Sequence, residues 1–328
     1  QCDAYSTALK IVVYDKVTIS NAGIDISVCE TSAISLNANT VGPNETGIWS
    51  VISPLNYQPF SPSDINNPNA SINNLPVNQE VILKWTITNT ICNTSSSDLV
   101  TIVNYQLPAN TISANQTLFC NGKADITITG STPINIGNPL TYRWQQSLNG
   151  IDWTDIQNAI EKDLSVPEFY QTTWFRRIIT IGQCDAYSTA LKIVVYDKVT
   201  ISNAGIDISV CETPAISLNA NTVGSNEAGT WSVISPLDYQ PFSPSDINNP
   251  NASINNLPAN QEVILKWTIT NTICNTSSSD LVTIVNYQLP ANTISANQTL
   301  FCDGKADMTI TGSTPINIGN PLTYRWQQ

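Results

Sequence analysis

The sequence repeats itself after 182 residues, and this repeat limits what the chain can fold into more than any other feature does. Residues 1–146 return as residues 183–328. A chain built in this way is an array of repeated structural units rather than one large domain. The two copies differ at eight positions, which are Ser32/Pro214, Pro43/Ser225, Thr46/Ala228, Ile48/Thr230, Asn56/Asp238, Val77/Ala259, Asn121/Asp303 and Ile126/Met308.

Cysteine spacing divides this long repeat in two. Cys29 and Cys120 are 91 residues apart, which is half of 182. The spacing predicts two alternating kinds of domain of about ninety residues, here named type A and type B. The predicted segments are the last strand of an upstream type B domain (1–16), a type A domain (17–106), a type B domain (107–198), a second type A domain (199–288) and the first strands of a truncated type B domain (289–328).

Alternation of apolar and polar residues predicts β-strands almost throughout. The segment "EVILKWTITNT" places on one face Val81, Leu83, Trp85 and Ile87. The polar "NTSSS" after Cys92 predicts a hairpin with the strand "DLVTIVNY", and Asn149-Gly150 predicts another hairpin turn. About seven short strands in each ninety-residue domain indicate an all-β fold of tandem immunoglobulin-like sandwiches. Because no Gly/Ser-rich spacer separates them, we expect the domains to lie end to end as a rod.

The cysteines favour disulfides formed in an oxidising compartment. There is no CxxC and no histidine to complete a zinc site, although free thiols and metal ligands remain alternatives. Near-equal spacing predicts one bond in each domain, and closing a loop of about 64 residues would contribute about 4 kcal/mol on the loop-entropy model. Cys2 and Cys302 would find partners outside this stretch. The predicted pairs are Cys29–Cys92, Cys120–Cys184 and Cys211–Cys274.

Composition excludes several classes of function. The chain has no histidine, so neither a Ser-His-Asp nor a Cys-His catalytic arrangement can form. We expect no enzymatic activity and no cofactor. A net charge of −12 argues against nucleic acid as a partner. No apolar run approaches the roughly 20 residues that a membrane span needs.

Two alternatives for binding remain open. Acidic residues near the junctions between domains could hold calcium, although no EF-hand-like loop is present. In "NGIDWTDIQ", Trp153 with Asp152 and Asp155 could bind sugar, or it could be a packed tryptophan beside a turn. The acidic residues near the junctions are Asp15, Asp25, Asp197 and Asp207.

Two stretches resemble known repeats. "SNAGIDISVCETSAISLNANTVGPNETGIWSV" with "TITNTICNTSSSDLVTIVNY", and "YRWQQSLNGIDWTDIQNA" with "TTWFRRIITIGQCDAYSTALKIVV", are similar to repeats of giant Bacteroidota surface proteins, the SprB-like gliding-motility adhesins. The resemblance implies type IX secretion, attachment to the outer membrane and display at the cell surface. It implies external surfaces or polysaccharide as partners, together with the gliding machinery and other copies of the chain. A passive stalk that presents a secreted enzyme, or a set of carbohydrate-binding repeats, remains the alternative.

Overall fold

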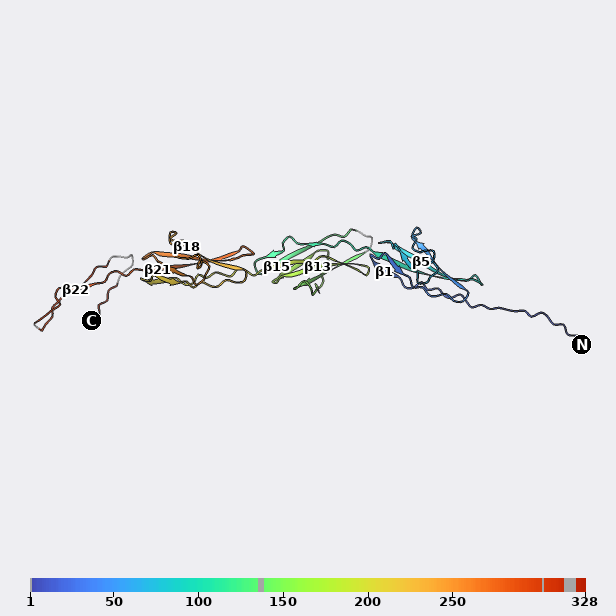
Figure 1. Ribbon diagram of the computed structural model, residues 1–328, viewed down its shortest axis with the longest axis horizontal. Helices are drawn as coiled ribbons and strands as arrows, with labels where there is room; N and C mark the ends of the chain where they lie inside the picture. The colour runs from blue at the N-terminus through green and yellow to red at the C-terminus, as the bar shows by residue number, and fades with distance from the viewer. Residues whose placement is uncertain (1, 135–138, 303, 316–322) are drawn as a thin grey trace. The chain divides into compact units, whose positions relative to one another are not determined.

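All regular structure in the described part of the chain is β-structure. The computed structural model describes residues 2–134, 139–302, 304–315 and 323–328 (Figure 1). The chain divides into two compact units, the first made of residues 1–119 and 123–195 and the second of residues 120–122 and 196–328. The predicted all-β class is confirmed. No helix occurs in these residues, and so none of them could span a bilayer as a helix.

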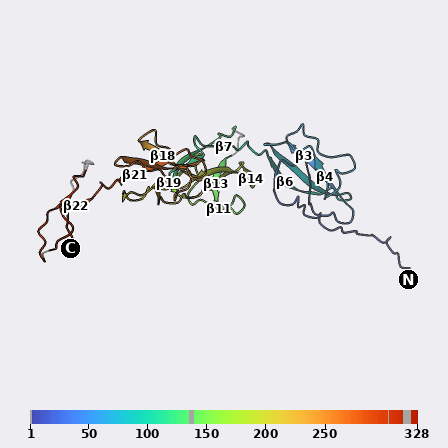
Figure 2. The same cartoon turned by 60° about the vertical axis from the view of Figure 1, so that its left-hand side comes forward.

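The first unit begins with two small sheets that share one core. The larger sheet has the order β1-β6-β5-β3, in which β1 runs parallel to β6 and the other neighbours are antiparallel. The smaller sheet pairs β2 with β4, and β4 is labelled in Figure 2 beside β3 and β6 of the larger sheet. The strands are β1 (Ile26–Cys29), β2 (Ala33–Ser35), β3 (Glu45–Ser53), β4 (Ser71–Asn73), β5 (Glu80–Asn89) and β6 (Ser95–Tyr105).

Strand β5 supplies the centre of this core. The four apolar residues predicted to share one face of this strand are all buried, which confirms the period-two reading. Trp85 packs against Trp49 with ring centroids 5.1 Å apart, and Trp49 Nε1 donates to Asn67 O at 3.0 Å. Burial of each large apolar side chain stabilises the fold by about 1.5–3 kcal/mol. The predicted hairpin is also present, with Thr88 of β5 opposite Ser95 of β6.

The second part of the first unit also has two sheets. One has the order β11-β10-β13-β15-β8, with β14 paired to β13, and the other has the order β12-β9-β7. The predicted turn at Asn149-Gly150 joins β10 to β11. The strands are β7 (Ile112–Ser113), β8 (Leu118–Phe119), β9 (Ala124–Gly130), β10 (Leu140–Ser147), β11 (Thr154–Asp155), β12 (Leu164–Phe169), β13 (Thr173–Ile181), β14 (Cys184–Tyr187) and β15 (Leu191–Val195).

A buried arginine organises this second core. The side chain of Arg177 is fully buried, and it donates to Asn110 Oδ1, Lys162 O and Ser131 O, each at 2.9 Å. Its guanidinium carbon lies 5.1 Å from the ring centroid of Tyr142. Burial lowers the pKa of Arg177 from its ordinary value. These oxygen acceptors satisfy the buried cation by hydrogen bonding, which is the condition for burying a charge without a large penalty.

The second unit repeats the first type A fold. Its sheets have the orders β16-β21-β20-β18 and β17-β19, and a short ladder pairs β22 with β23. Residues 303 and 316–322 of the predicted segment 289–328 lie outside the described residues. The strands are β16 (Ile208–Cys211), β17 (Ala215–Ser217), β18 (Glu227–Ser235), β19 (Ser253–Asn255), β20 (Glu262–Asn271), β21 (Ser277–Tyr287), β22 (Ile294–Ala296) and β23 (Ile310–Gly312).

Residues 2–16 form no strand, although residues 1–16 are predicted to be the last strand of a preceding type B domain; Gln1 lies outside the described residues (Figure 1). Their copies at 184–198 include β14 and β15, which pair with β13 and β8. A strand is stable only beside hydrogen-bonding partners. In the part of the chain that the structure describes, residues 2–16 have no strand partner.

Glycine is required where β3 crosses the ring of Trp85. A Cβ added at Gly47 would lie 2.3 Å from the Trp85 ring, and one added at Gly229 would lie 2.3 Å from the Trp267 ring. We expect the double variant Gly47→Ala/Gly229→Ala to lower the free energy of unfolding of each type A domain by about 1–3 kcal/mol, because a closely packed core does not absorb an extra methyl group. Urea titration followed by tryptophan fluorescence measures this loss.

The second copy supplies a matched control for this variant. Ala228 stands where the first copy has Thr46, so Thr46→Ala makes the two copies alike at the neighbouring position. We expect Thr46→Ala to change the unfolding free energy by less than about 0.5 kcal/mol. Equal losses from the glycine and threonine variants would contradict the packing described for Trp85.

Candidate functional site

The two cysteines of a type A domain lie at opposite ends of its sheet. Cys29 ends β1 and pairs with Tyr105, the last residue of β6. Cys92 lies in the turn before β6 begins. The 11 residues of β6 span about 35 Å, whereas a disulfide needs Cα atoms within about 7 Å. The predicted Cys29–Cys92 bond is therefore wrong. Cys211–Cys274 is wrong for the same reason, because β16 and β21 repeat this geometry.

The type B cysteines are separated in the same way. Cys184 begins β14 opposite Ile181, the last residue of β13. Cys120 directly follows β8, which pairs with the end of β15 beyond the first residue of β13. The nine residues of β13 span about 30 Å. The predicted Cys120–Cys184 bond is wrong, since no strand of this length can fold its two ends together.

Disulfides instead join cysteines from different domains. One bond joins Cys29 to Cys184 within the first unit, and the other joins Cys120 to Cys274 within the second, each with a Cα–Cα distance of 5.8 Å. Their separations of 155 and 154 residues are as regular as the spacing that suggested bonds inside each domain, so spacing alone could not decide the pairing. The partners predicted for Cys2 and Cys302 outside this stretch stay a prediction. The free and exposed cysteines are Cys2, Cys92, Cys211 and Cys302.

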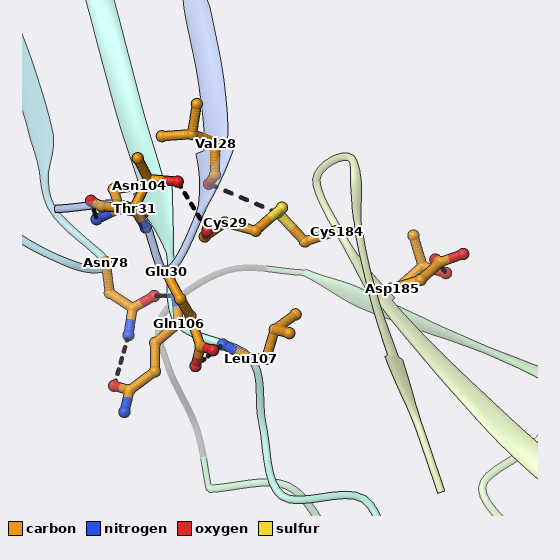
Figure 3. The surroundings of a disulfide bond; sticks show 11 residues. Val28, Cys29, Glu30, Thr31, Asn78, Asn104, Gln106, Leu107, Cys184 and Asp185 are labelled. Atoms are coloured by element: carbon orange, nitrogen blue, oxygen red, sulfur yellow. Dashed lines mark hydrogen bonds between the residues drawn. A yellow bond between two sulfur atoms is a disulfide. The ribbon is translucent and has the colours of Figure 1, made fainter. Parts of the chain in front are cut away.

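Residues of both domains pack around the Cys29–Cys184 disulfide (Figure 3). The Sγ of Cys184 lies 3.6 Å from Val28 O, and Cys184 is only 1% exposed. Glu30, which follows Cys29, has a φ of 46° and donates its N–H to Tyr105 O at 3.0 Å. Its carboxylate accepts from the N–H of Leu107 at 3.2 Å. The chain segment that leaves the type A domain is thus held beside the cysteine.

A tight turn of the type B domain packs against the same end of the type A domain. Gly182, between β13 and β14, has a φ of +58°, a conformation that favours glycine. A Cβ at this position would lie 2.3 Å from the ring of Tyr105. The glycine therefore allows both the turn and the close approach that brings Cys184 to Cys29. Gly182 was not identified from the sequence as a residue of the junction. The glycine in "IGQC", directly before the cysteine, was the only feature of the sequence that could have indicated it.

Asn110 holds the other end of the segment between the two domains. Its Nδ2 donates to Arg177 O at 2.9 Å and to Ala186 O at 2.8 Å, while its Oδ1 accepts from Arg177 Nε. Residues 107–110 are thereby anchored to Glu30 on one side and to the buried arginine on the other. The junction has a covalent link and a hydrogen-bonded link side by side.

A carboxylate holds the opposite end of each type A domain. Glu45 accepts from the N–H groups of Thr18 and Gly42, each at 2.7 Å, and the bond from Thr18 has the largest effect in lowering the pKa of Glu45. Glu227 does the same in the second copy, where hydrogen bonds from Thr200 and Gly224 lower its pKa against the opposing effect of burial. The stability that these carboxylates contribute is present at neutral pH and is lost as the pH falls through their lowered pKa values.

The residues considered for sugar binding have partners within the protein. The guanidinium of Arg176 lies 4.3 Å above the ring of Trp153. Asp155 accepts from Gln145 at 2.6 Å and from Arg143 at 3.1 Å, and these bonds lower its pKa. Asp152 accepts from the side-chain amide of Asn149 at 2.7 Å. The tryptophan and both acids are thus held in contacts that fold this hairpin.

The acidic residues considered for calcium do not come together as a cluster. Asp25 accepts from the N–H of Thr101, and Asp207 accepts from that of Thr283, each at 2.8 Å. Within the described ranges, no group of three or more acidic, cysteine or histidine side chains is placed to hold a metal ion. Asp15 and Asp197 are among the described residues, and neither belongs to such a group. Calcium at the junctions therefore gains no support from the geometry.

Comparisons with known proteins agree with the fold. Residues 108–197 match a family described as a domain of unknown function (DUF8696). The eight N-terminal immunoglobulin domains of Down Syndrome Cell Adhesion Molecule align with a TM-score of 0.52 and 13% identity, over 82% of this chain and 36% of that one. The titin I-band fragment I67–I69 aligns with a TM-score of 0.48 and 12% identity, over 83% and 99%. Among curated proteins none matches.

The alignment with the cell-adhesion fragment agrees with the observed strands on the fold: the chain is a tandem array of immunoglobulin-like β-sandwiches. It spans about a third of the length of the cell-adhesion fragment that it matches. Disulfides persist in oxidising compartments, so the two bonds indicate an extracellular protein.

Disulfide mapping tests the pairing directly. We expect proteolysis without reduction to release cross-linked peptides for Cys29–Cys184 and Cys120–Cys274, and iodoacetamide to label the four free cysteines in the folded protein. Cys184→Ser should make Cys29 reactive toward iodoacetamide, whereas Cys92→Ser should leave both bonds intact. A cross-linked peptide containing Cys29 and Cys92 would contradict the structure.

Proposed function

We propose that this chain is part of the shaft of a large repetitive cell-surface adhesin, and that its repeats carry tension rather than catalyse a reaction. The observation that carries the proposal is the pair of disulfides between domains. Each bond closes a loop of about 155 residues, which contributes about 5 kcal/mol on the loop-entropy model. A bond inside one domain would protect that domain alone, whereas these bonds also span the connections between domains.

The two disulfide loops overlap, and this overlap limits how far the chain can extend. Residues 120–184 belong to both loops. The shortest covalent route between the ends of the chain crosses Cys29–Cys184, returns along this shared segment and crosses Cys120–Cys274. It bypasses about 180 residues, or roughly 600 Å of extended chain. A pulling force would therefore reach the covalent limit long before all domains had unfolded, which suits a shaft under load.

The more specific part of the proposal is that the adhesin serves gliding motility. It rests on the resemblance to SprB-like adhesins, which also implies type IX secretion, attachment to the outer membrane, and external surfaces or polysaccharide as partners. Near-identical copies fit a shaft, because such arrays are extended by adding units and gain avidity from number. The end-to-end arrangement as a rod belongs to the same proposal.

The alternatives differ in what the repeats themselves would do. Carbohydrate-binding repeats need aromatic rings that are free to stack on sugars, but five of the eight tryptophans are fully buried in domain cores. These five are Trp49, Trp85, Trp144, Trp231 and Trp267. A passive stalk for an enzyme would use the same shaft mechanics, and a catalytic domain elsewhere in the protein would favour it.

Single-molecule pulling tests the tension-bearing role. Reduction of both disulfides should increase the final contour length of the chain by roughly 600 Å. Because the loops overlap, Cys274→Ser alone should add only roughly 90 Å. Cys92→Ser is the matched control, since Cys92 occupies the same position in the first copy but is free. A contour length that reduction does not change would contradict the proposal.

Tracking of the labelled protein on living cells tests the proposed role in gliding motility. A fluorescent antibody fragment raised against residues 17–198 should label the surface of source cells as discrete spots, and in a gliding adhesin these spots should travel along the cell. Fixed spots would contradict the gliding role and leave a static adhesin or enzyme stalk. Absence of surface label on cells that produce the protein would overturn the proposed location.

A further inference from the structure

The same surface occurs at one end of both type A domains, but among the described residues a type B turn covers it only in the first copy. In the first copy, the type B turn at Gly182 packs on Tyr105, and Cys184 is bonded to Cys29. In the second copy, the equivalent Cys211 is free and exposed. Beside it lies an open hollow of about 330 Å³, which is lined by Glu212, Ala259, Asn286, Tyr287 and Gln288.

The uncovered surface already has the conformation of the covered one. Glu212 has a φ of 48° and donates to Tyr287 O at 3.0 Å, as Glu30 with a φ of 46° donates to Tyr105 O at 3.0 Å. The side chain of Asn286 accepts from the N–H of Thr213 at 3.1 Å, the same length as its equivalent in the first copy. The surface is therefore preformed, and binding there does not lose the conformational entropy of ordering a loop.

Sequence differences do not block the second surface. Of the five residues that line the hollow, only Ala259 differs from its counterpart, which is Val77 in the first copy. This change removes volume and leaves the aromatic ring in place. Leu289, which follows the hollow, is 55% exposed, whereas Leu107 at the same position beside the docked turn is half-buried. The second surface thus retains Val210, Cys211 and Tyr287, the counterparts of the residues that meet the type B turn and its cysteine in the first copy.

We infer that Cys211 and the hollow beside it form a docking site for a further type B domain, which inserts the turn equivalent to Ile181–Cys184 and becomes bonded through its cysteine. The occupant is specified by the first unit, where Tyr105 and Cys29, the counterparts of Tyr287 and Cys211, meet that turn and its cysteine. Glycine at the position of Gly182 lets the turn lie against the ring of Tyr287. The inference rests on the geometry of the two copies and not on the proposed role as an adhesin.

Bond formation needs an oxidant, and a small-molecule disulfide supplies it. The Cys211 thiolate attacks this disulfide, forms a mixed disulfide and releases one thiol. The thiolate of the incoming cysteine then attacks the Cys211 sulfur, which forms the protein disulfide and releases the second thiol. Two protein thiols are oxidised and one small disulfide is reduced to two thiols. Docking raises the local concentration of the incoming cysteine, which favours this second step over competing exchange.

An extended chain tests the inference. A copy of residues 147–198 is fused after residue 328, so that it continues residues 289–328, which repeat 107–146 with two substitutions. The fused copy carries Thr189→Ser as a mass label. After oxidation with glutathione disulfide, we expect iodoacetamide labelling of Cys211 to fall at least ~10-fold relative to the original chain. A cross-linked peptide should contain Cys211 and the fused cysteine, and Pro214 distinguishes the Cys211 peptide from that of Cys29.

Tyr287→Ala in the extended chain separates docking from chance oxidation. It should slow formation of the Cys211 bond by about 10-fold. The rate at which the Cys29–Cys184 bond forms should be unchanged, and this rate is the internal control. Circular dichroism and the two existing bonds report whether the extended chain is folded. Full labelling of Cys211 in the folded, extended chain would overturn the inference, as would a bond from Cys211 to any other cysteine or equal rates with and without Tyr287.

Discussion

The length of a β-strand is the constraint on which the arrangement of this chain depends. In each domain type, one long strand stands between the two cysteines and keeps them about 30–35 Å apart. A disulfide tolerates only a Cα separation of about 7 Å, so no bond can form inside a domain. The four bonded cysteines, Cys29, Cys120, Cys184 and Cys274, are therefore paired with cysteines of neighbouring domains. The covalent framework thereby acts at the connections between domains, where immunoglobulin-like arrays are otherwise held by short segments of chain.

The contacts around the Cys29–Cys184 junction depend on the same placement of cysteines at the ends of strands. Gly182 allows a turn narrow enough to lie on Tyr105, and Glu30 turns the type A chain so that its carboxylate meets the departing segment at Leu107. Asn110 then fixes that segment to Arg177, which is itself the centre of the type B core. Core, connecting segment and disulfide are therefore linked through a short series of contacts. A substitution in the core, in the connecting segment or at the disulfide would therefore alter the packing at the junction.

Much of the fold could be predicted from sequence because it depends on local pattern. The alternation in "EVILKWTITNT" placed Trp85 and its neighbours on the buried face, and the polar "NTSSS" located the hairpin before β6. Turn chemistry located the hairpin at Asn149-Gly150. Residues 2–16 show the limit of such reasoning, since the same letters form strands at 184–198, where β13 and β8 are present to pair with them. The disulfides show a second limit, because two pairings were equally regular in sequence.

The sequence by itself determined the repeat, the all-β class, the positions of the principal strands and the absence of histidine chemistry, because each of these follows from residue type and short-range spacing. Only the tertiary structure decided which cysteines pair, why Gly182 is a glycine, and that Arg177 is buried among oxygen acceptors. These features depend on which strand ends meet in space. Cys29 and Cys92 are separated by 63 residues in sequence and by the full length of β6 in the fold, whereas Cys29 and Cys184 are 155 residues apart in sequence and in covalent contact.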